Sequence, residues 1–340
     1  MSADAARLFA PGHTVALSPD GSYLLSDECS GTVRLWETKS GQCLRVFSKQ
    51  ASEFSAVAFS PDGRLFVQGL PDRTIKLWEV ESGRCVRTLQ GHQREICSAI
   101  FSADGRFLLS GSIDTTIRLW EVESGRCLTT LQGHNIWVWS MACSPDGRLL
   151  ASGSHDGVVK LWEIGSGQCL HTLQGSPKAI LALTFTSGGS RLLSSNAQDL
   201  VTVWDVQSGD CLRTVPGIEE TYWLGSVAFS ADGSLLATAG SDQTVKLWEV
   251  SSGELLRTFP CHPGQPWPVA FSADQRLLAS GTDDGSILLW ERQTGKCLMT
   301  LRSDRPYERM NITGVTGITE AQRASLKILG AIEGGDGTGR

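Results

Sequence analysis

Serine, histidine and aspartate recur together in this sequence at fixed spacing. The serine follows the histidine by 18 residues and the aspartate follows the serine by four, in the sets His92, Ser110 and Asp114; His134, Ser152 and Asp156; and His262, Ser280 and Asp284. These are the residue types of a hydrolytic triad, in which histidine takes a proton from a serine nucleophile. A catalytic set, however, occurs once in a chain and places its serine at an exposed turn beside an oxyanion hole. Three equivalent sets therefore favour a repeated structural role, and we expect no enzymatic activity.

A tryptophan follows each set and marks a repeat that covers most of the chain. Successive members lie 42 residues apart, with one interval of 44, at Trp36, Trp78, Trp120, Trp162, Trp204, Trp248 and Trp290. In one unit, short apolar segments at 138–143, 148–153, 158–163 and 169–173 are separated by turn sequences rich in Gly, Asp and Ser. Four such strands form one antiparallel sheet, whose apolar faces need neighbouring sheets to cover them. The repeat predicts an all-β fold, a seven-bladed β-propeller of four-stranded antiparallel blades.

The repeat units resemble those of the WD-repeat family over residues 10–301. The resemblance is carried by the period, by Gly-His elements and by the acidic residue after each tryptophan, which is Glu in six units and Asp205 in one. It implies that the His, Ser, Asp and Trp of a unit form a buried hydrogen-bonded tetrad. The tetrad is complete in units three, four and seven, which end in Trp120, Trp162 and Trp290. We therefore expect these three blades to be the most rigid.

Four tryptophans lie outside the repeat position, at Trp137, Trp139, Trp223 and Trp267. The resemblance implies that residues just after the Gly-His element, and the residue before the tetrad Asp, surround the mouth of the central channel where partners dock. The residues assigned to this face are Trp137, Trp139, His155, Tyr222, Trp223, Trp267, Asp283 and Glu95. Exposed aromatic side chains among polar groups are typical of binding sites. The sequence thus predicts a site for a protein or peptide with basic or apolar character. The alternative is that some rings, above all Trp139 and Trp267, fill the channel or pack between blades.

The charge and composition of the chain argue against several classes of partner. Its 340 residues carry a formal net charge of −6 and no run of Lys or Arg, which argues against nucleic acid as a partner. No secretory signal and no apolar stretch of membrane-spanning length is visible. No phosphate-loop or metal-ligand motif occurs, so we expect no cofactor and no metal. These features predict a cytoplasmic protein that forms a monomeric ring.

Six of the ten cysteines occupy one position of the repeat, seven residues after a repeat tryptophan. They are Cys43, Cys85, Cys127, Cys169, Cys211 and Cys297. Equivalent positions in neighbouring blades are too far apart for a disulfide. We expect these side chains to be small buried hydrophobic groups that remain free thiols, in keeping with a reducing compartment.

Residues 302–340 break the repeat and predict a C-terminal extension after a propeller of residues 1–301. Thr319 and Gln322 have the spacing of a capping box, which predicts a short helix near 320–329 ahead of a disordered end. The segment 301–333 is similar to the C-terminal end of bacterial WD-repeat proteins of the signal-transducing NTPase (STAND) class. That resemblance implies a bacterial protein of a sensor lineage. Two functions follow: a non-catalytic binding scaffold or sensor, or a regulatory sensor subunit acting in trans on a separately encoded NTPase switch.

The strand that completes blade seven has two candidates. Residues 297–301, CLMTL, match the fourth strand of the other units, but residues 6–9, ARLF, resemble the same strand. We favour 297–301, because this segment is continuous with the three preceding strands.

Overall fold

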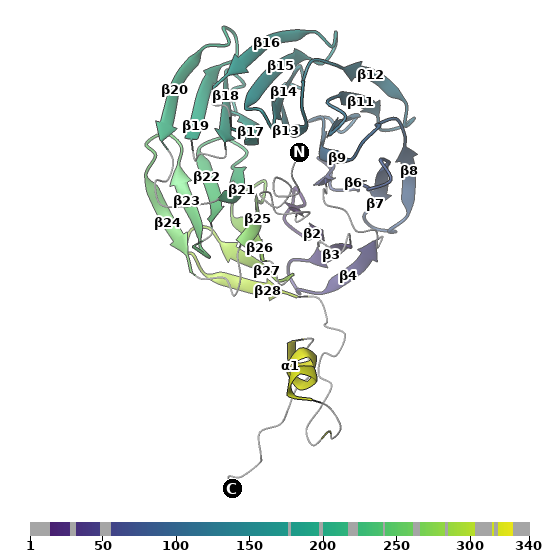
Figure 1. The fold of residues 1–340 in the computed structure, drawn as a ribbon, viewed down its shortest axis with the longest axis vertical. Coiled ribbons are helices and arrows are strands. Elements are labelled where there is room, and N and C mark those ends of the chain that lie inside the picture. Colours follow the sequence, from purple (N-terminus) through teal and green to yellow (C-terminus); the bar gives the residue numbers. More distant parts are fainter. Residues whose placement is uncertain are drawn as a thin grey trace. The chain divides into compact units, whose positions relative to one another are not determined.

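The structure, a computed structural model, forms a ring of seven four-stranded sheets (Figure 1). It describes residues 14–27, 32–47, 56–175, 178–196, 200–216, 224–240, 242–260, 266–282, 285–302, 315 and 319–328. The chain divides into two units, Met1–Leu301, which holds the ring, and Arg302–Arg340. Within each sheet, neighbouring strands are consecutive in the chain and antiparallel. The predicted seven-bladed β-propeller of antiparallel blades is confirmed.

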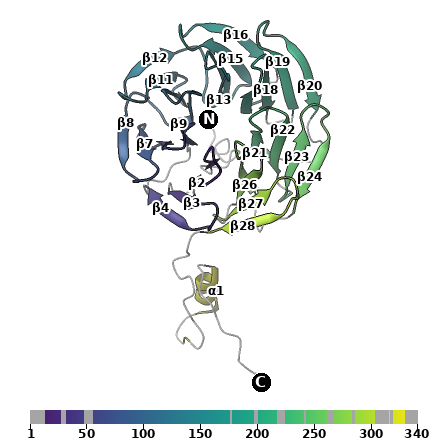
Figure 2. The same cartoon turned by 180° about the vertical axis from the view of Figure 1, so that it is seen from behind.

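The four strands of each blade run in chain order from the centre of the ring to its rim (Figures 1 and 2). The first, innermost strands are β1 (Thr14–Leu17), β5 (Val57–Phe59), β9 (Ile96–Phe101), β13 (Val138–Cys143), β17 (Ile180–Phe185), β21 (Leu224–Phe229) and β25 (Pro266–Phe271). The second strands are β2 (Tyr23–Asp27), β6 (Leu65–Gly69), β10 (Phe107–Ser112), β14 (Leu149–Ser154), β18 (Arg191–Asn196), β22 (Leu235–Gly240) and β26 (Leu277–Thr282). The third strands are β3 (Val33–Glu37), β7 (Ile75–Glu79), β11 (Ile117–Glu121), β15 (Val158–Glu163), β19 (Leu200–Asp205), β23 (Val245–Glu249) and β27 (Ile287–Glu291). The fourth, outermost strands are β4 (Cys43–Phe47), β8 (Cys85–Leu89), β12 (Cys127–Leu131), β16 (Cys169–Gln174), β20 (Cys211–Pro216), β24 (Leu255–Phe259) and β28 (Cys297–Leu301).

The hydrophobic core of the described residues is divided among the joints between blades. Each of seven clusters is shared by two neighbouring blades. At the joint of blades three and four, Leu109 packs in one cluster with Val138 and Leu150. At the joint of blades seven and one, Leu289 shares a cluster with Leu24. Because burying a leucine side chain contributes about 2 kcal/mol, the closing joint is stabilised in the same way as the other six.

Blade seven is completed by β28. Residues Cys297–Leu301 pair antiparallel with β27, which confirms the favoured closing strand. The alternative, residues 6–9, lies outside the described residues. The rim also closes here, because Gly41 of blade one lies so near Met299 that a Cβ at that glycine would be 2.5 Å from the methionine sulfur.

The prediction that the repeated cysteines are buried is wrong. Cys85 and Cys211 are exposed, and the other four repeated cysteines are partly buried. The physical reason is their place at the start of the fourth strands, where no further strand covers the outer edge of the blade. The eight cysteines in the described residues are free thiols, including all six of the repeat.

The C-terminal unit contains one short helix among its described residues, α1 (Glu320–Ile328). Its start is a capping box: the Thr319 N–H donates to Gln322 Oε1 at 2.8 Å, and the Gln322 N–H donates to Thr319 Oγ1 at 3.2 Å. Residue 329 and the segment predicted to be disordered lie outside the described residues. Nowhere in the described part of the chain is a helix long and apolar enough to cross a membrane.

Candidate functional site

The repeated polar residues gather on one face of the propeller. In an antiparallel blade, the loop that enters the first strand and the turn between the second and third strands lie at the same end of the sheet. The described histidines of the predicted tetrads, His92 and His134, lie in such loops, and Asp114 and Asp156 lie in such turns. Among the described residues, this end of the blades therefore carries the His and Asp of the predicted tetrads as well as Glu95, Trp137 and His155 of the predicted binding face.

Each repeat tryptophan donates its indole N–H to the side chain ten residues earlier. The bonds measure 2.8–3.2 Å and the acceptors are Ser26, Gln68, Ser110, Ser152, Ser194, Thr238 and Ser280. Five of the seven rings are buried, whereas Trp78 and Trp248 are partly exposed. The repeat tryptophans thus make an equivalent hydrogen bond in all seven blades, including the blades whose polar sets are incomplete.

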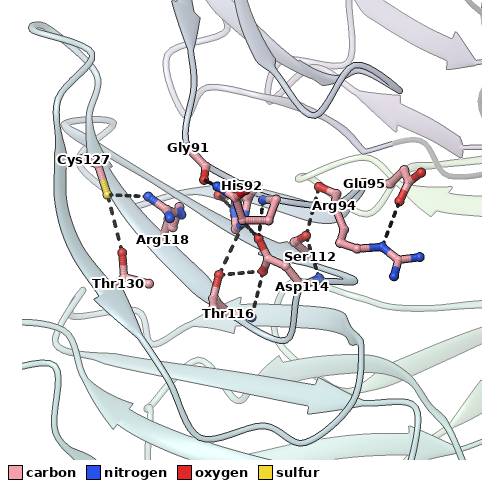
Figure 3. Close-up of polar contacts among 12 residues, drawn as sticks. Gly91, His92, Arg94, Glu95, Ser112, Asp114, Thr116, Arg118, Cys127 and Thr130 are labelled. Carbon is pink, nitrogen blue, oxygen red and sulfur yellow. Dashed lines mark hydrogen bonds and ion pairs between the residues drawn. The ribbon is translucent and has the colours of Figure 1, made fainter.

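Blade three contains the complete tetrad, of which Figure 3 shows His92 and Asp114. The Trp120 N–H donates to Ser110 Oγ at 2.8 Å, and Ser110 Oγ lies 2.7 Å from His92 Nε2. His92 Nδ1 lies 2.8 Å from Asp114 Oδ2. Because an ionised carboxylate only accepts, His92 donates from Nδ1 and accepts the serine proton at Nε2. The predicted tetrad of this blade is confirmed.

Asp114 is held in its ionised form by its neighbours. Burial alone would raise the pKa of Asp114, but hydrogen bonds outweigh burial and hold that pKa well below its usual range. The donors are His92, the Gln93 N–H at 2.8 Å and Thr116, whose hydroxyl donates at 2.6 Å and whose N–H donates at 3.0 Å. A network with every member bonded is rigid and leaves no nucleophile free.

Blade four keeps only three members of the tetrad. The Trp162 N–H donates to Ser152 Oγ at 2.8 Å, and Ser152 Oγ lies 2.7 Å from His134 Nε2. Asp156 makes no bond to His134, whose buried Nδ1 has no partner among the described residues. The tetrad predicted for this blade is therefore wrong in its aspartate.

The side chain at position 158 explains the difference between the two blades. In three other turns a threonine two residues after the aspartate donates its hydroxyl to the carboxylate, in the pairs Thr74–Asp72 (2.6 Å), Thr116–Asp114 (2.6 Å) and Thr244–Asp242 (2.8 Å). Blade four has Val158, which offers only its backbone N–H, at 3.1 Å from Asp156 Oδ1. The hydroxyl of Ser154 takes the place of the missing donor and bonds to Asp156 Oδ1.

The incomplete network leaves His134 neutral. Its burial, and secondly the nearby charge of Lys160, lower the pKa of His134 to about 4, while Asp156 acts in the opposite sense. Because Ser152 Oγ already accepts from the Trp162 N–H, we assign its proton to His134 Nε2, and in this tautomer the neutral ring carries its own proton on Nδ1 as a buried donor. Blade four therefore contains an unsatisfied polar group, which is uncommon in folded proteins.

Beside this network, three of the predicted binding residues come together. The His155 ring lies near both tryptophans, with its centroid 5.4 Å from that of Trp137 and 6.4 Å from that of Trp139. The His155 N–H also donates to the Trp137 carbonyl at 3.1 Å. All three side chains are partly buried. Burial lowers the pKa of His155, with Asp156 opposing, so the group is uncharged at neutral pH. We call Trp137, Trp139 and His155 the blade-four aromatic cluster.

A β-bulge positions Trp139. The pairing of β13 with β14 shifts between Val138 and Ser140, so Trp139 is the extra residue. The pairing of β25 with β26 shifts between Pro266 and Val269, a stretch that includes Trp267. A bulge bends a strand and redirects its side chain. The two tryptophans that follow their histidines by five residues thus share a local backbone feature.

Glu95 occupies in blade three the place that Trp137 has in blade four. The Ile113 N–H donates to the Glu95 carbonyl at 3.0 Å, as the His155 N–H does to that of Trp137. The Glu95 carboxylate lies 3.9 Å from the Arg94 guanidinium, and the side chains are 38% and 63% exposed. Arg94 partly offsets the acidic charge expected at this position. The sequence interpretation missed this arginine, although it directly precedes Glu95.

The remaining predicted site residues are not brought together by the described structure. Tyr222, Trp223 and Asp283 lie outside the described residues, as do His262 and Asp284 of the blade-seven tetrad. Trp267 lies in β25, but its side chain is not among those described. No group of three or more His, Cys, Asp or Glu side chains within the described residues could hold a metal ion.

The fold and its repeated Trp–Ser hydrogen bonds define a seven-bladed β-propeller built from tryptophan-containing repeats. The family model described as "WD domain, G-beta repeat" matches seven segments, 9–37, 41–79, 83–121, 125–163, 167–205, 209–249 and 253–291. The chain therefore belongs to the WD-repeat family, whose propellers are generally non-catalytic and typically bind proteins or peptides. No curated protein matches the chain.

Proposed function

We propose that this protein is a non-catalytic scaffold or sensor that binds a protein segment over the blade-four aromatic cluster. The observation that carries this proposal is the ring contact of His155 with both Trp137 and Trp139, at the face where the entering loops lie. Partly exposed tryptophans supply large apolar contact areas at low entropic cost, and they are frequent energetic centres of interfaces.

The surroundings of the cluster indicate what kind of segment it accepts. The rings and the neutral His155 favour an apolar or aromatic side chain, and the Glu95 carboxylate on the next blade favours a basic group beside it. By their sequence positions, Tyr222, Trp223, Trp267 and Asp283 extend the same surface over blades six and seven. The partner is thus a peptide or protein loop, with no nucleic acid and no membrane involved, and the setting we propose is the cytoplasm.

Affinity capture with Trp137→Ala tests the proposal. We expect the variant to lose about 2 kcal/mol of binding, roughly 30-fold in affinity, because it removes a central aromatic contact. Leu170→Ala is the matched control, since Leu170 is 44% exposed on the rim strand of the same blade. Thermal unfolding of both variants should stay close to that of the unmodified protein. A partner that binds Trp137→Ala fully but not Leu170→Ala would place the interface on the rim instead.

A second candidate function keeps this surface and makes the propeller a regulatory subunit of a separately encoded NTPase switch. It is favoured by the C-terminal segment, which resembles that of bacterial sensor proteins and which begins its helix with the expected capping box. Co-purification of a protein with a phosphate loop, lost when residues 302–340 are deleted, would support this role.

A further inference from the structure

We propose that Asp156 is a positioning residue for the blade-four aromatic cluster, with two places for its carboxylate. The first, present in the structure, is on the Ser154 hydroxyl. The second is on the Nδ1–H of His134, as Asp114 sits on His92 in blade three. The proposal rests on the proposed function only in taking the cluster as the binding surface.

The second place is accessible from the observed backbone. The turns of blades three and four have the same left-handed residue after the aspartate, with φ of 71° at Thr115 and 83° at Gly157. In blade three this backbone directs the carboxylate to the histidine. Asp156 also lies near enough to His134 for its charge to act on the imidazole. The turn of blade four therefore has the same left-handed residue as the turn from which the blade-three carboxylate reaches its histidine.

Each place leaves one donor in need of another partner. In the observed arrangement the His134 Nδ1–H is buried and has no acceptor among the described residues. In the second arrangement the Ser154 hydroxyl loses its carboxylate. Blade three shows how that hydroxyl is then satisfied, because the equivalent Ser112 donates to the Arg94 carbonyl at 3.2 Å. Ile136 supplies the equivalent carbonyl in blade four. The Ser154 hydroxyl therefore has an acceptor in either arrangement of Asp156.

The position of Asp156 is linked directly to the aromatic cluster. His155 precedes it in the same turn and is tied to Trp137 by a backbone hydrogen bond of 3.1 Å and by ring contact. Trp137 in turn lies three residues after His134 in the entering loop. A carboxylate bond between Asp156 and His134 would draw these two loops together, and a ligand that fits one spacing of the rings would select one place of the carboxylate.

The charged and titratable groups around His134 give the two arrangements different proton affinities. Lys160 disfavours the imidazolium and Asp156 favours it, while His155 faces Asp156 from the turn. When the carboxylate is on Nδ1, the imidazolium gains a charged hydrogen bond and the pKa of His134 rises. The titration of His134 therefore reports where Asp156 is.

Two variants move Asp156 by opposite chemical means. Val158→Thr is nearly isosteric and supplies the hydroxyl that the turns of Asp72, Asp114 and Asp242 possess. Ser154→Ala removes the competing donor. In ¹⁵N-histidine NMR, with His134 assigned from His134→Gln, we expect both to raise the His134 pKa by at least one unit. The double variant Val158→Thr/Asp156→Asn should lose this rise, and the His92 ring signals at neutral pH should be the same in every variant.

Fluorotryptophan NMR of the same proteins tests the link to the surface. The Trp137 and Trp139 signals should shift in Val158→Thr and return in the double variant, whereas the Trp120 signal stays in place. An unchanged His134 pKa in both single variants would show that the second place does not exist. A raised pKa with unmoved Trp137 and Trp139 signals would overturn the positioning role. Neither measurement needs the partner, so its outcome is separate from that of the Trp137→Ala capture test.

Discussion

Blades three and four are adjacent copies of one repeat, yet only blade three completes its polar network. Both have the histidine, serine, aspartate and tryptophan at the same spacing. The difference arises from a fifth residue, which is Thr116 in blade three and Val158 in blade four. Whether a buried network is complete therefore depends on the neighbouring donors that orient its members, as well as on the members themselves.

The two blades also differ in the residues that they carry at the predicted binding face. In blade three the residues at the binding face are the charged Arg94 and Glu95, which pair with each other. In blade four the same face carries the aromatic cluster over an unsatisfied histidine. The blade with the complete network, blade three, has a polar surface. The blade with the incomplete network, blade four, carries the surface that we propose for binding. Strained or unsatisfied groups often accompany functional sites.

A fall in pH should produce the largest difference in stability between blades three and four. An unfolded histidine titrates near pH 6.5, whereas the pKa of His134 is about 4. The neutral ring thus contributes stability that is complete above about pH 6.5 and is lost as the pH falls towards 4, about 3 kcal/mol in all. The lowered pKa of Asp114 contributes stability above the unfolded value near pH 3.9, which is lost only below it.

Hydrogen exchange, corrected for the intrinsic pH dependence of the rates, measures this difference between pH 6.5 and 4. Amides of β14 and β15 should lose protection while those of β10 and β11 keep theirs. Equal loss in the two blades would mean that His134 is not the group responsible. Val158→Thr should reduce the loss in blade four, because it brings a carboxylate to the protonated ring.

Replacement of the aspartates should have the next largest effect. Asp114→Asn weakens charged hydrogen bonds from four donors, and we expect it to cost about 2 kcal/mol. Asp156→Asn disturbs only the turn, since its amide oxygen still accepts from Ser154 and from the Val158 N–H, and should cost about 0.5 kcal/mol. Local exchange in each blade, together with urea unfolding, compares the two. A cost at Asp156 equal to that at Asp114 would indicate a closed blade-four tetrad.

The fold could be predicted from the sequence because it follows from local patterns repeated seven times. The spacing of Trp36 to Trp290 sets the number of blades, and the continuity of residues 297–301 with β27 identifies the closing strand. The burial of the cysteines was mispredicted, because an apolar residue type does not reveal whether its strand is inside the ring or on its rim. Cys85 and Cys211 belong to the outermost strands and are exposed there.

The candidate site was predictable only in part. Subtracting the repeat isolates Trp137 and Trp139, the resemblance to the WD-repeat family adds His155, and the structure brings these three rings together. The failed bond between Asp156 and His134 was not foreseen, because it depends on competition between Ser154 and an absent hydroxyl at position 158. Such a competition involves residues that a motif of four members does not include.

The backbone of the two turns gives the smallest expected difference in stability between the blades, and this difference favours blade four. Thr115 of blade three has a φ of 71°, a left-handed conformation that is unfavourable for a β-branched residue, whereas blade four has Gly157 at the same place with a φ of 83°. Left-handed backbone costs an L-residue about 1–2 kcal/mol, but glycine also raises the entropy of the unfolded chain by up to about 1 kcal/mol. Thr115→Gly should therefore stabilise blade three by about 0.5 kcal/mol, and Gly157→Thr should destabilise blade four by a similar amount, as measured by thermal unfolding. If Thr115→Gly destabilises instead, the threonine side chain makes a contact that outweighs its strain, and the more rigid blade would owe part of its stability to the turn as well as to the tetrad.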